Sequence, residues 1–414
     1  MLPASVDVAI IGAGAAGVGA ARVLAGSGLT TLILEATARV GGRAHTEMLG
    51  GVPLDLGCGW LHSADRNGWA RIAAERGTEI ERTRAAWTKQ YRNLGFAPQD
   101  QQAAGDAFDA FETRLREHPP ASDCAADALE PGGEWNAYLQ ALSGYINGVG
   151  LEALSVADYL AYDDAASETN WRLPGGYGSL VASNRPPSLP LALAAPVTAV
   201  DADGAALTLR TPHGDVSARA AIVTASSGVL ASGGLRLPPA LDDHLHAAAG
   251  LPLGLADKLF LALDGPDGLP ADQHLIGDPH DPATGTYYLR PFGYPVVECF
   301  FGGEGAERIE REGQDAAARF AVEQLTRLLG AKLRVRLLGG SAWRADPWFR
   351  GSYSHALPGR RTDRAVLATP WDQRIWFAGE ATSAQDFSTA HGALATGEAA
   401  ARAAIGALRP ARAS

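Results

Sequence analysis

The sequence predicts an α/β protein with two domains. Its 414 residues exceed what a single hydrophobic core usually supports, and 46% of them are hydrophobic, which is ample for burial. Strand-like and helical patterns alternate near both ends of the chain, whereas the middle carries a mixture of the two. The 49 glycines and 25 prolines predict many tight turns between these elements.

The first 35 residues read as a strand, a helix and a second strand. The apolar run over residues 7–11 predicts a buried strand. A helix of small residues follows over 15–28, where Gly28 can end it, and residues 30–35 predict the second buried strand. This βαβ unit of about 30 residues has the size of a dinucleotide-binding half.

A glycine motif lies between the first strand and the helix. Gly12, Gly14 and Gly17 form the pattern GxGxxG. The first glycine permits the tight turn, the second lets a pyrophosphate approach the helix N-terminus, and the third lets the helix pack on the sheet. Glu35 ends the next strand, about 20 residues on, where an acid accepts hydrogen bonds from a ribose. The sequence therefore predicts a Rossmann-like dinucleotide site.

The middle of the chain mixes helices with short strands. The pattern turns mostly helical between residues 67 and 116, and again between 134 and 160. Alternating segments over 189–224 predict a small β-meander that ends in a buried strand.

The last third of the chain repeats this mixture. We expect strands at residues 258–263 and 294–303, followed by an amphipathic helix over 314–329. A strand at 374–380 and a long helix from about Thr389 complete the predicted order.

Charge and cysteine content exclude several classes of protein. The formal net charge of −11 argues against nucleic-acid binding, which needs a basic surface, and favours cationic partners. Cys58, Cys124 and Cys299 are too few and too scattered for a disulfide framework or a zinc site, so we expect no metal. We see neither a targeting segment nor a membrane span, and we expect a cytoplasmic monomer or homodimer.

Lysine is rare in this chain. Lys89, Lys258 and Lys332 are the only lysines among 35 basic residues. Lys258 follows Asp257 in a predicted strand that is otherwise apolar. Because a buried ammonium is unfavourable without a partner, this lysine is a candidate functional residue.

Six segments resemble one protein family in the correct order along the chain. The resemblance lies in EATARVGGRAHT (35–46), DLGCGWLHS (55–63), WRLPGGYGSL (171–180), APVTAV (195–200), SAWRADPWFRGSYSHALPG (341–359) and the flavin-type block at 375–404. The family is that of the flavin-containing amine oxidases. The versions of the motifs are most similar to those of polyamine oxidases and lysine-specific histone demethylases.

The resemblance implies an FAD-binding domain of the glutathione reductase type, with an inserted mixed α+β substrate domain. The implied FAD-binding domain comprises residues 1–82, 172–242 and 340–414, and the substrate domain comprises 83–171 and 243–339. The FAD should be non-covalent, because Ser352 stands where monoamine oxidases carry the cysteine that bonds to the flavin.

The resemblance also implies the residues that contact FAD. Arg39 and Arg43 would supply cations for its phosphates, and the Val197 backbone would meet the adenine. The full implied set is Gly12, Gly14, Ala15, Gly17, Glu35, Ala36, Arg39, Gly42, Arg43, Gly59, Trp60, Val197, Trp343, Ser352, Gly379, Glu380, Thr389 and Ala390.

Four residues are implied in catalysis. Lys258 matches the family lysine that holds a water near the flavin, and Tyr353 matches one wall of the substrate cage. Thr389 stands at the opposite wall, where monoamine oxidases have a second tyrosine. His62 follows Trp60 as in polyamine oxidases, where the histidine lies near the substrate amine.

The implied reaction is oxidation of an amine, such as a polyamine or secondary amine, to an imine that water hydrolyses to a carbonyl product. Dioxygen or another acceptor takes the electrons, and dioxygen would yield hydrogen peroxide. An L-amino-acid oxidase is one alternative, with Arg84 or Arg290 as candidates to bind a carboxylate. A carbon–carbon desaturase of the carotenoid or protoporphyrinogen oxidase type is a second. A flavin-bearing binding protein is a third.

Overall fold

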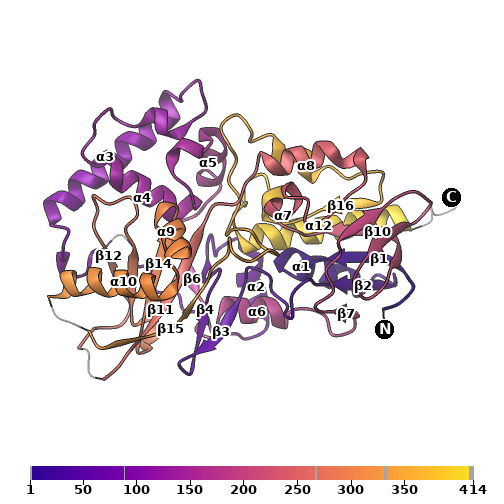
Figure 1. The fold of residues 1–414 in the computed structure, drawn as a ribbon, viewed down its shortest axis with the longest axis horizontal. Helices are drawn as coiled ribbons and strands as arrows, with labels where there is room; N and C mark the ends of the chain where they lie inside the picture. Colours follow the sequence, from indigo (N-terminus) through magenta and orange to yellow (C-terminus); the bar gives the residue numbers. More distant parts are fainter. Residues whose placement is uncertain (1, 88, 266–267, 331–332, 410–414) are drawn as a thin grey trace.

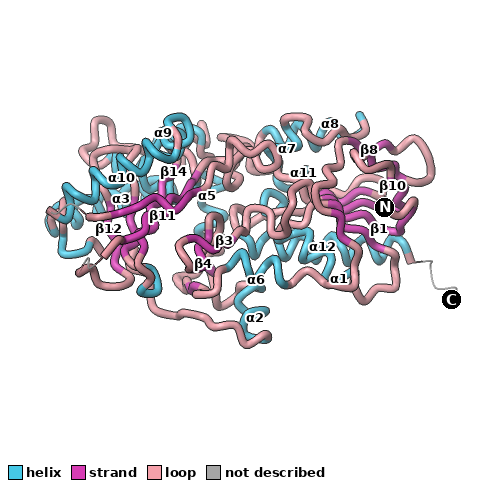
Figure 2. Tube along the Cα trace, turned by 60° about the horizontal axis from the view of Figure 1, so that its bottom comes forward, coloured by secondary structure: helices cyan, strands magenta, loops and turns pink. Residues whose placement is uncertain are grey.

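The computed structural model describes residues 2–87, 89–265, 268–330 and 333–409. Two sheets organise the molecule, and they lie toward its opposite ends in both views (Figure 1, Figure 2). Across these described ranges, no helix combines the length and apolar character needed to cross a membrane.

The seven-stranded sheet contains the predicted N-terminal unit. Its parallel centre pairs β2 (Thr31–Leu34) with β1 (Ser5–Ile11), β1 with β10 (Val216–Val223), and β10 with β16 (Ile375–Phe377). Most residues of these strands are apolar and buried, as in a parallel sheet covered on both faces. The remaining strands are β7 (Leu191–Ala192), which pairs with β2, and the antiparallel β8 (Ala199–Asp201) and β9 (Leu207–Arg210).

Two helices of small residues cover one face of this sheet. Helix α1 (Ala15–Leu24) packs along α12 (Ala390–Leu408), as both views show (Figure 1, Figure 2). A Cβ on Gly19 would lie 2.7 Å from the Leu394 carbonyl oxygen, and one on Gly397 would lie 2.0 Å from that of Ala16. The glycines therefore allow the two helix backbones to approach closely, which brings the two ends of the chain together.

The opposite face of the same sheet packs against three short helices. These are α7 (Ser227–Ala231), α8 (Asp242–Ala249) and α11 (Asp363–Ala368). Helix α8 lies just beyond the domain boundary expected at residue 242, and its Ala247 and Ala248 belong to the core of the seven-stranded sheet. Its packing partners are therefore those of the seven-stranded sheet.

The five-stranded sheet is antiparallel throughout. Its order is β12–β13–β14–β11–β15, with the bounds β11 (Ala256–Leu263), β12 (Gln273–Ile276), β13 (Thr286–Leu289), β14 (Val296–Gly302) and β15 (Val335–Gly340). Helices α9 (Glu304–Glu312) and α10 (Gln314–Leu329) pack on one face, where Leu325 and Leu328 join the core. Residues alternate between faces along each strand, so the other face carries Lys258, Tyr288 and Glu298.

Further helices and hairpins complete the molecule. They are α2 (Gly68–Glu75), α3 (Pro98–Glu117), α4 (Asn136–Asn147), α5 (Val156–Asp163), α6 (Tyr177–Ser183), the hairpin β3 (Thr46–Leu49) and β4 (Val52–Asp55), and the pair β5 (Trp60–Leu61) and β6 (Trp171–Arg172).

The predicted elements are largely confirmed. Helix α10 has the bounds expected from its periodicity, and the long C-terminal helix and the meander leading into β10 are present. The expected helical content between residues 67 and 116 is partly wrong, because the described residues of 76–97, which leave out residue 88, contain only a single 3-10 turn, Tyr91–Asn93. Strands β12, β13 and β15 and helix α9 were not anticipated.

Candidate active site

The glycine motif lies at the edge formed by the carboxyl ends of β1, β2, β10 and β16. Gly12 follows β1 with φ of +106°, a conformation that favours glycine. A Cβ on Gly17 would lie 2.0 Å from the Gly12 carbonyl oxygen, so this glycine lets α1 pack against the turn. A Cβ on Gly14 would meet nothing nearer than 3.8 Å. The turn therefore leaves space at the N-terminus of α1, where phosphate is favoured.

A second opening lies at the same edge. Gly379 follows β16, and a Cβ built on it would meet no atom within 4 Å. Ala15 directly follows Gly14 as the first residue of α1. The Gly379 N–H donates to the Thr396 hydroxyl at 3.0 Å, in the second turn of the helix α12 that begins at Ala390. These features fit a dinucleotide lying across the ends of the parallel strands.

Glu35 directly follows β2 and is buried. Its carboxylate accepts hydrogen bonds from the Ala13 N–H (2.7 Å) and from the N–H and hydroxyl of Thr37 (2.8 and 2.7 Å). The Ala195 N–H donates to the Glu35 carbonyl oxygen at 2.8 Å, which places the segment containing Val197 beside the end of β2. Ala36 directly follows Glu35 in the chain. The structure therefore brings together Glu35, Ala36 and Val197, three of the residues expected to contact the cofactor.

The basic loop after Glu35 is tied to the C-terminal segment. Arg39 donates to the Gly42 carbonyl oxygen at 2.7 Å, within its own loop. Arg43 donates to the Ser352 carbonyl oxygen at 2.6 Å and forms an ion pair with Glu380 at 3.0 Å. Burial alone would raise the pKa of Glu380, but Arg43 and neighbouring hydrogen bonds hold it below its ordinary value. The carboxylate therefore stays ionised and fastens three distant segments.

Lys258 lies at the face of the five-stranded sheet that is directed away from α10. Only 9% of its side chain is exposed, and its Nζ lies 2.9 Å from Oε1 of Glu298 on the neighbouring strand β14. A Cβ on Gly59 would lie 2.9 Å from the same Nζ. The ammonium group thus lies between an acid and the backbone of the segment that was predicted to run beside the flavin.

Aromatic rings extend from this ion pair. Tyr288 is the direct cross-strand neighbour of Glu298. The Trp60 ring lies 6.1 Å from Tyr288 and 4.5 Å from Trp87, measured between ring centroids. The guanidinium of Arg172 lies 4.9 Å from the Trp60 ring. The rings of Tyr288, Trp60 and Trp87 form an aromatic wall beside the charged groups, a combination typical of ligand sites.

His62 is fixed next to this wall. Its Nδ1 lies 2.7 Å from Oδ1 of Asn170, and its ring lies 5.8 Å from that of Trp87. Burial is the main cause that lowers the pKa of His62, so the ring is neutral at pH 7. Because a carboxamide oxygen accepts, Nδ1 carries the hydrogen and Nε2 is left with a lone pair.

Three predicted residues use their hydroxyl groups in the fold. Tyr353 donates to the Tyr145 carbonyl oxygen at 2.8 Å. The Ser352 hydroxyl bridges the N–H and C=O of Ala256, both at 2.8 Å. Thr389 is the N-cap of α12 and accepts from a backbone N–H in its first turn. Because these hydroxyl groups are already hydrogen-bonded within the protein, a ligand would contact the ring face of Tyr353 and the methyl group of Thr389 instead.

Trp343 lies in the core. Its ring packs edge-on against Phe349, with 5.3 Å between centroids, and both residues belong to the core of the five-stranded sheet. Its backbone N–H donates to the Asp257 carboxylate at 3.2 Å. A Cβ on Gly57 would lie 3.3 Å from the indole, so Trp343 packs against the segment that leads to Gly59.

Sequence reasoning missed four residues of this region. They contact or adjoin predicted residues but belong to no motif that we identified: Glu298, Tyr288, Trp87 and Asn170. A signal existed for Glu298, because it is the only charged residue in the apolar strand over 294–303. No local pattern marks Asn170, which lies 108 residues from its partner.

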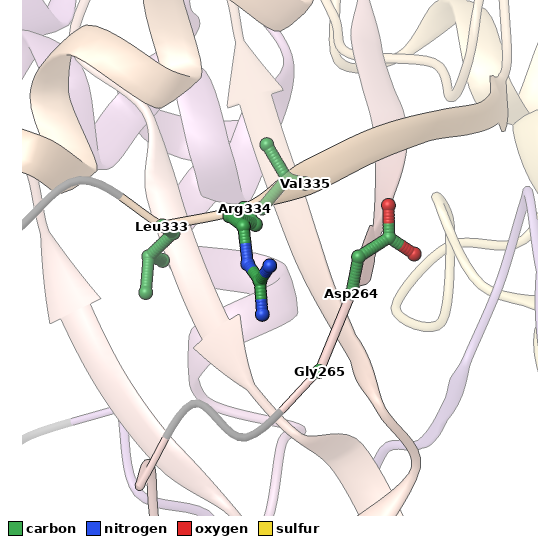
Figure 3. A pocket seen from close by; sticks show the side chains of 5 residues that line it. All are labelled: Asp264, Gly265, Leu333, Arg334 and Val335. Carbon is green, nitrogen blue, oxygen red and sulfur yellow. The ribbon is translucent and has the colours of Figure 1, made fainter.

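A separate pocket lies at the far end of strand β11. Its cavity of about 660 Å³ is lined by Asp264, Gly265, Leu333, Arg334 and Val335, whose side chains Figure 3 shows. Asp264 follows Lys258 by six residues along the strand direction, which is about 20 Å at the usual rise per residue. None of the predicted site residues lines it, so we do not assign the predicted chemistry there.

Comparison with known proteins gives the decisive observation. A sequence model of the family described as flavin containing amine oxidoreductase matches residues 68–405, and one of an NAD(P)-binding Rossmann-like domain matches residues 10–75. The chain belongs to the flavin-containing amine oxidoreductase family. The resemblance and the fold class predicted from the sequence are thereby confirmed.

Individual relatives agree with this membership. Polyamine oxidase 2 of Arabidopsis thaliana is 28% identical over 428 residues, which cover 95% of this chain and 86% of the relative. Polyamine oxidase 4 of rice (Oryza sativa subsp. japonica) is 28% identical, with 95% and 88% covered. A structure of wild-type putrescine oxidase bound to putrescine superposes with a TM-score of 0.78 at 20% identity, covering 97% of this chain and 99% of that one.

Membership in this amine oxidoreductase family identifies the cofactor and the reaction class. The cofactor is FAD, and the open glycine turn, the buried acid after β2 and the opening at Gly379 fit it. The protein is an FAD-dependent enzyme that oxidises amines. The family match therefore favours this function over a carbon–carbon desaturase or a flavin-bearing binding protein.

Proposed function

We propose that this enzyme oxidises di- or polyamines, or other secondary amines, with dioxygen as the acceptor and hydrogen peroxide as a product. The observation that carries the proposal is the Lys258–Glu298 ion pair beside Gly59 and the aromatic wall. Two relatives that carry the name polyamine oxidase and match nearly the whole chain also support it. When bound, FAD supplies the two-electron acceptor for the oxidation.

His62 would prepare the substrate amine. An amine must lose its ammonium proton before its α-carbon can be oxidised, because the lone pair stabilises the developing positive charge. The neutral ring presents Nε2 as a proton acceptor, while Nδ1 is held by Asn170 at 2.7 Å. Asn170 thus orients the base and selects its tautomer.

Lys258 would hold a water molecule at the reacting centre. Its Nζ has three hydrogens, and the bond to Glu298 uses one of them. The other two can hold a water molecule for hydrolysis of the imine to the carbonyl product. Trp60 and Tyr353 would restrict other water and orient the amine through their ring faces. On the opposite wall, the methyl group of Thr389 would occupy less space than a second aromatic ring.

An L-amino-acid oxidase would need a free arginine for the substrate carboxylate. Arg172 is the guanidinium next to the aromatic wall, and it is paired with Glu81 (3.0 Å) and Asp272 (2.9 Å). Arg84 is exposed. Arg290 donates to the Gly293 carbonyl oxygen at 3.0 Å within its own turn. These positions favour an amine without a carboxylate as the substrate.

A substrate panel tests the proposal. Peroxide production and flavin bleaching should be measured with putrescine, spermidine, an N-alkylated diamine, benzylamine and several L-amino acids. We expect a di- or polyamine or secondary amine to give the highest kcat/KM. A tenfold advantage for benzylamine or an amino acid would overturn the substrate assignment. Turnover only with an artificial electron acceptor would overturn the assignment of dioxygen.

Domain limits and location complete the proposal. We propose that the FAD-binding domain comprises residues 1–82, 172–242 and 340–414, supported by the strands of the seven-stranded sheet falling in these ranges. The rest of helix α8, beyond residue 242, packs on this domain from the adjoining segment. A cytoplasmic location is supported by the three cysteines, all of which are unpaired. Limited proteolysis and fractionation of the native host test these two statements.

A further inference from the structure

Three arginines line a pocket far from the glycine motif. Its cavity of about 360 Å³ is lined by Arg22, Arg76, Ser183, Asn184, Arg185, Pro186 and Pro187. Arg22 lies in the last turn of α1, whereas Gly14 caps the first turn of the same helix. The ten residues of α1 span about 15 Å, so this pocket is separate from the FAD edge.

The three guanidinium groups have no acidic partner. Elsewhere in this acidic chain, several arginines pair with carboxylates, as Arg43 and Arg172 do. Within the described residues, Arg22, Arg76 and Arg185 form no ion pair. Three like charges around one cavity repel one another, and an anion between them would relieve that repulsion.

The pocket is built by specific hydrogen bonds. Asn184 is buried, and its Oδ1 accepts from Nη1 of Arg22 at 3.0 Å while its Nδ2 donates to the Leu180 carbonyl oxygen at 2.7 Å. Nη1 of Arg185 donates to the Pro186 carbonyl oxygen at 2.8 Å. Nε of Arg22 is buried without a hydrogen-bond partner. Arg22 and Arg185 are therefore held in place with donors still unused, whereas Arg76 is exposed and reaches the pocket from the end of α2.

Helix termini explain only part of this arrangement. Arg22, Arg76 and Arg185 lie at or near the C-terminal ends of α1, α2 and α6, where cations are favoured. Each helix end carries a partial charge of about −0.5, and α2 and α6 are short, so the three cations exceed what the helix ends neutralise.

We propose that this pocket binds a small anion of the phosphate class, with several negative oxygens that match the guanidinium donors. Planar guanidinium groups bind phosphate oxygens in pairs, and the cavity has the size of a small-ligand site. The site is independent of the amine oxidation chemistry, and its occupant would stabilise the junction of α1, α2 and α6.

Pyrophosphate binding to the FAD-loaded enzyme tests this proposal. Calorimetric titration, at ionic strength held constant with chloride, should give saturable binding by the wild type. Arg76→Gln and Arg185→Gln should each weaken the affinity at least tenfold, because each removes one phosphate contact. Arg71→Gln is the matched control, since it removes an exposed arginine of α2 that pairs with Glu75 outside the pocket.

A control variant and two further ligands test whether the binding is specific to this pocket. We expect Arg71→Gln to bind pyrophosphate as the wild type does, and orthophosphate to bind more weakly than pyrophosphate. ADP tests whether the phosphates belong to a nucleotide, and competition between ADP and pyrophosphate would support one shared site. Non-saturable binding, or equal affinity in wild type, Arg76→Gln and Arg185→Gln, would overturn the proposal. Circular dichroism on each variant confirms that the folded protein is being compared.

Discussion

Lys258 and Glu298 form an ion pair across two adjacent strands, with Nζ and Oε1 2.9 Å apart. The register explains the contact: Lys258 pairs with Phe300, and Glu298 lies two residues away on the same face of β14. The lysine is nearly enclosed, whereas 23% of the Glu298 side chain is exposed. The acid therefore compensates the charge of a lysine that the fold holds against Gly59.

Replacing Lys258 should slow turnover without preventing folding. Lys258→Met fills a similar volume without the charge, and we expect FAD to be retained. Loss of the water held at Nζ should slow the reaction roughly 10- to 1,000-fold, the range for a positioned acid–base or electrostatic group. Stopped-flow absorbance resolves the reductive and oxidative half-reactions. Wild-type rates in both would leave the lysine with a structural role only.

Glu298→Gln is the companion variant. It keeps a hydrogen-bond acceptor for Lys258 but removes the negative charge, so we expect a smaller loss of rate than in Lys258→Met. The double variant should be no slower than Lys258→Met alone if Glu298 acts only through the lysine. Additive losses would instead indicate a separate contact between Glu298 and the substrate.

Gly14→Val should lose FAD while leaving the fold intact. Its Cβ would meet nothing nearer than 3.8 Å in the protein, so the new side chain would occupy the space expected for the pyrophosphate. Gly17→Val is the contrasting variant, because its Cβ would lie 2.0 Å from a carbonyl oxygen and should destabilise the turn itself. Flavin absorbance and circular dichroism separate the two effects. Full FAD occupancy in Gly14→Val would contradict this account.

Acid precipitation should release the flavin. Ser352 has no thiol, and its hydroxyl is bound on both sides by the backbone of Ala256. The supernatant should therefore be yellow and the pellet colourless. Flavin that remains in the pellet would show a covalent bond and refute the non-covalent prediction.

Breaking the buried pair Asp158–Arg364 should strongly destabilise the protein. The two side chains are 1% and 2% exposed and form two hydrogen bonds of 2.7 Å that join α5 to α11. Asp158→Asn leaves the guanidinium buried without its counter-ion, and we expect a loss of about 3–5 kcal/mol in the free energy of unfolding. Urea denaturation measures it. The exposed pair Arg71–Glu75 is the control, where Glu75→Gln should change stability by less than about 1 kcal/mol.

His274 should make stability depend on pH on the acidic side. Burial lowers the pKa of His274 to about 4, below its value of about 6.5 in an unfolded chain. Between these values the unfolded state binds a proton that the folded state does not, so unfolding becomes easier as the pH falls. In this range, His274 lowers the free energy of unfolding by about 1.4 kcal/mol for each unit by which the pH falls. His274→Phe should reduce the slope between pH 6 and 5 by that amount in urea titrations, and an unchanged slope would contradict it.

Local patterns predicted much of the fold and several of the residues that the structure gathers at the candidate site. The glycine turn, Glu35 and helix α10 follow from spacing and periodicity, because turns and amphipathic helices are encoded within a few residues. The segment over 76–97 was misjudged as helical, since its order comes from contacts with other elements rather than from its own pattern. Strands β12 and β13 were missed for the same reason.

The sequence by itself determined that the chain would bind a dinucleotide, that Lys258 was unusual among its basic residues, and which family it belongs to. Only the tertiary structure decided that Lys258 meets Glu298 and that His62 meets Asn170, 40 and 108 residues apart respectively. Such pairs arise from strand register and from the return of distant segments to one sheet edge. Those arrangements depend on the burial of the whole apolar surface, which no short stretch of sequence specifies.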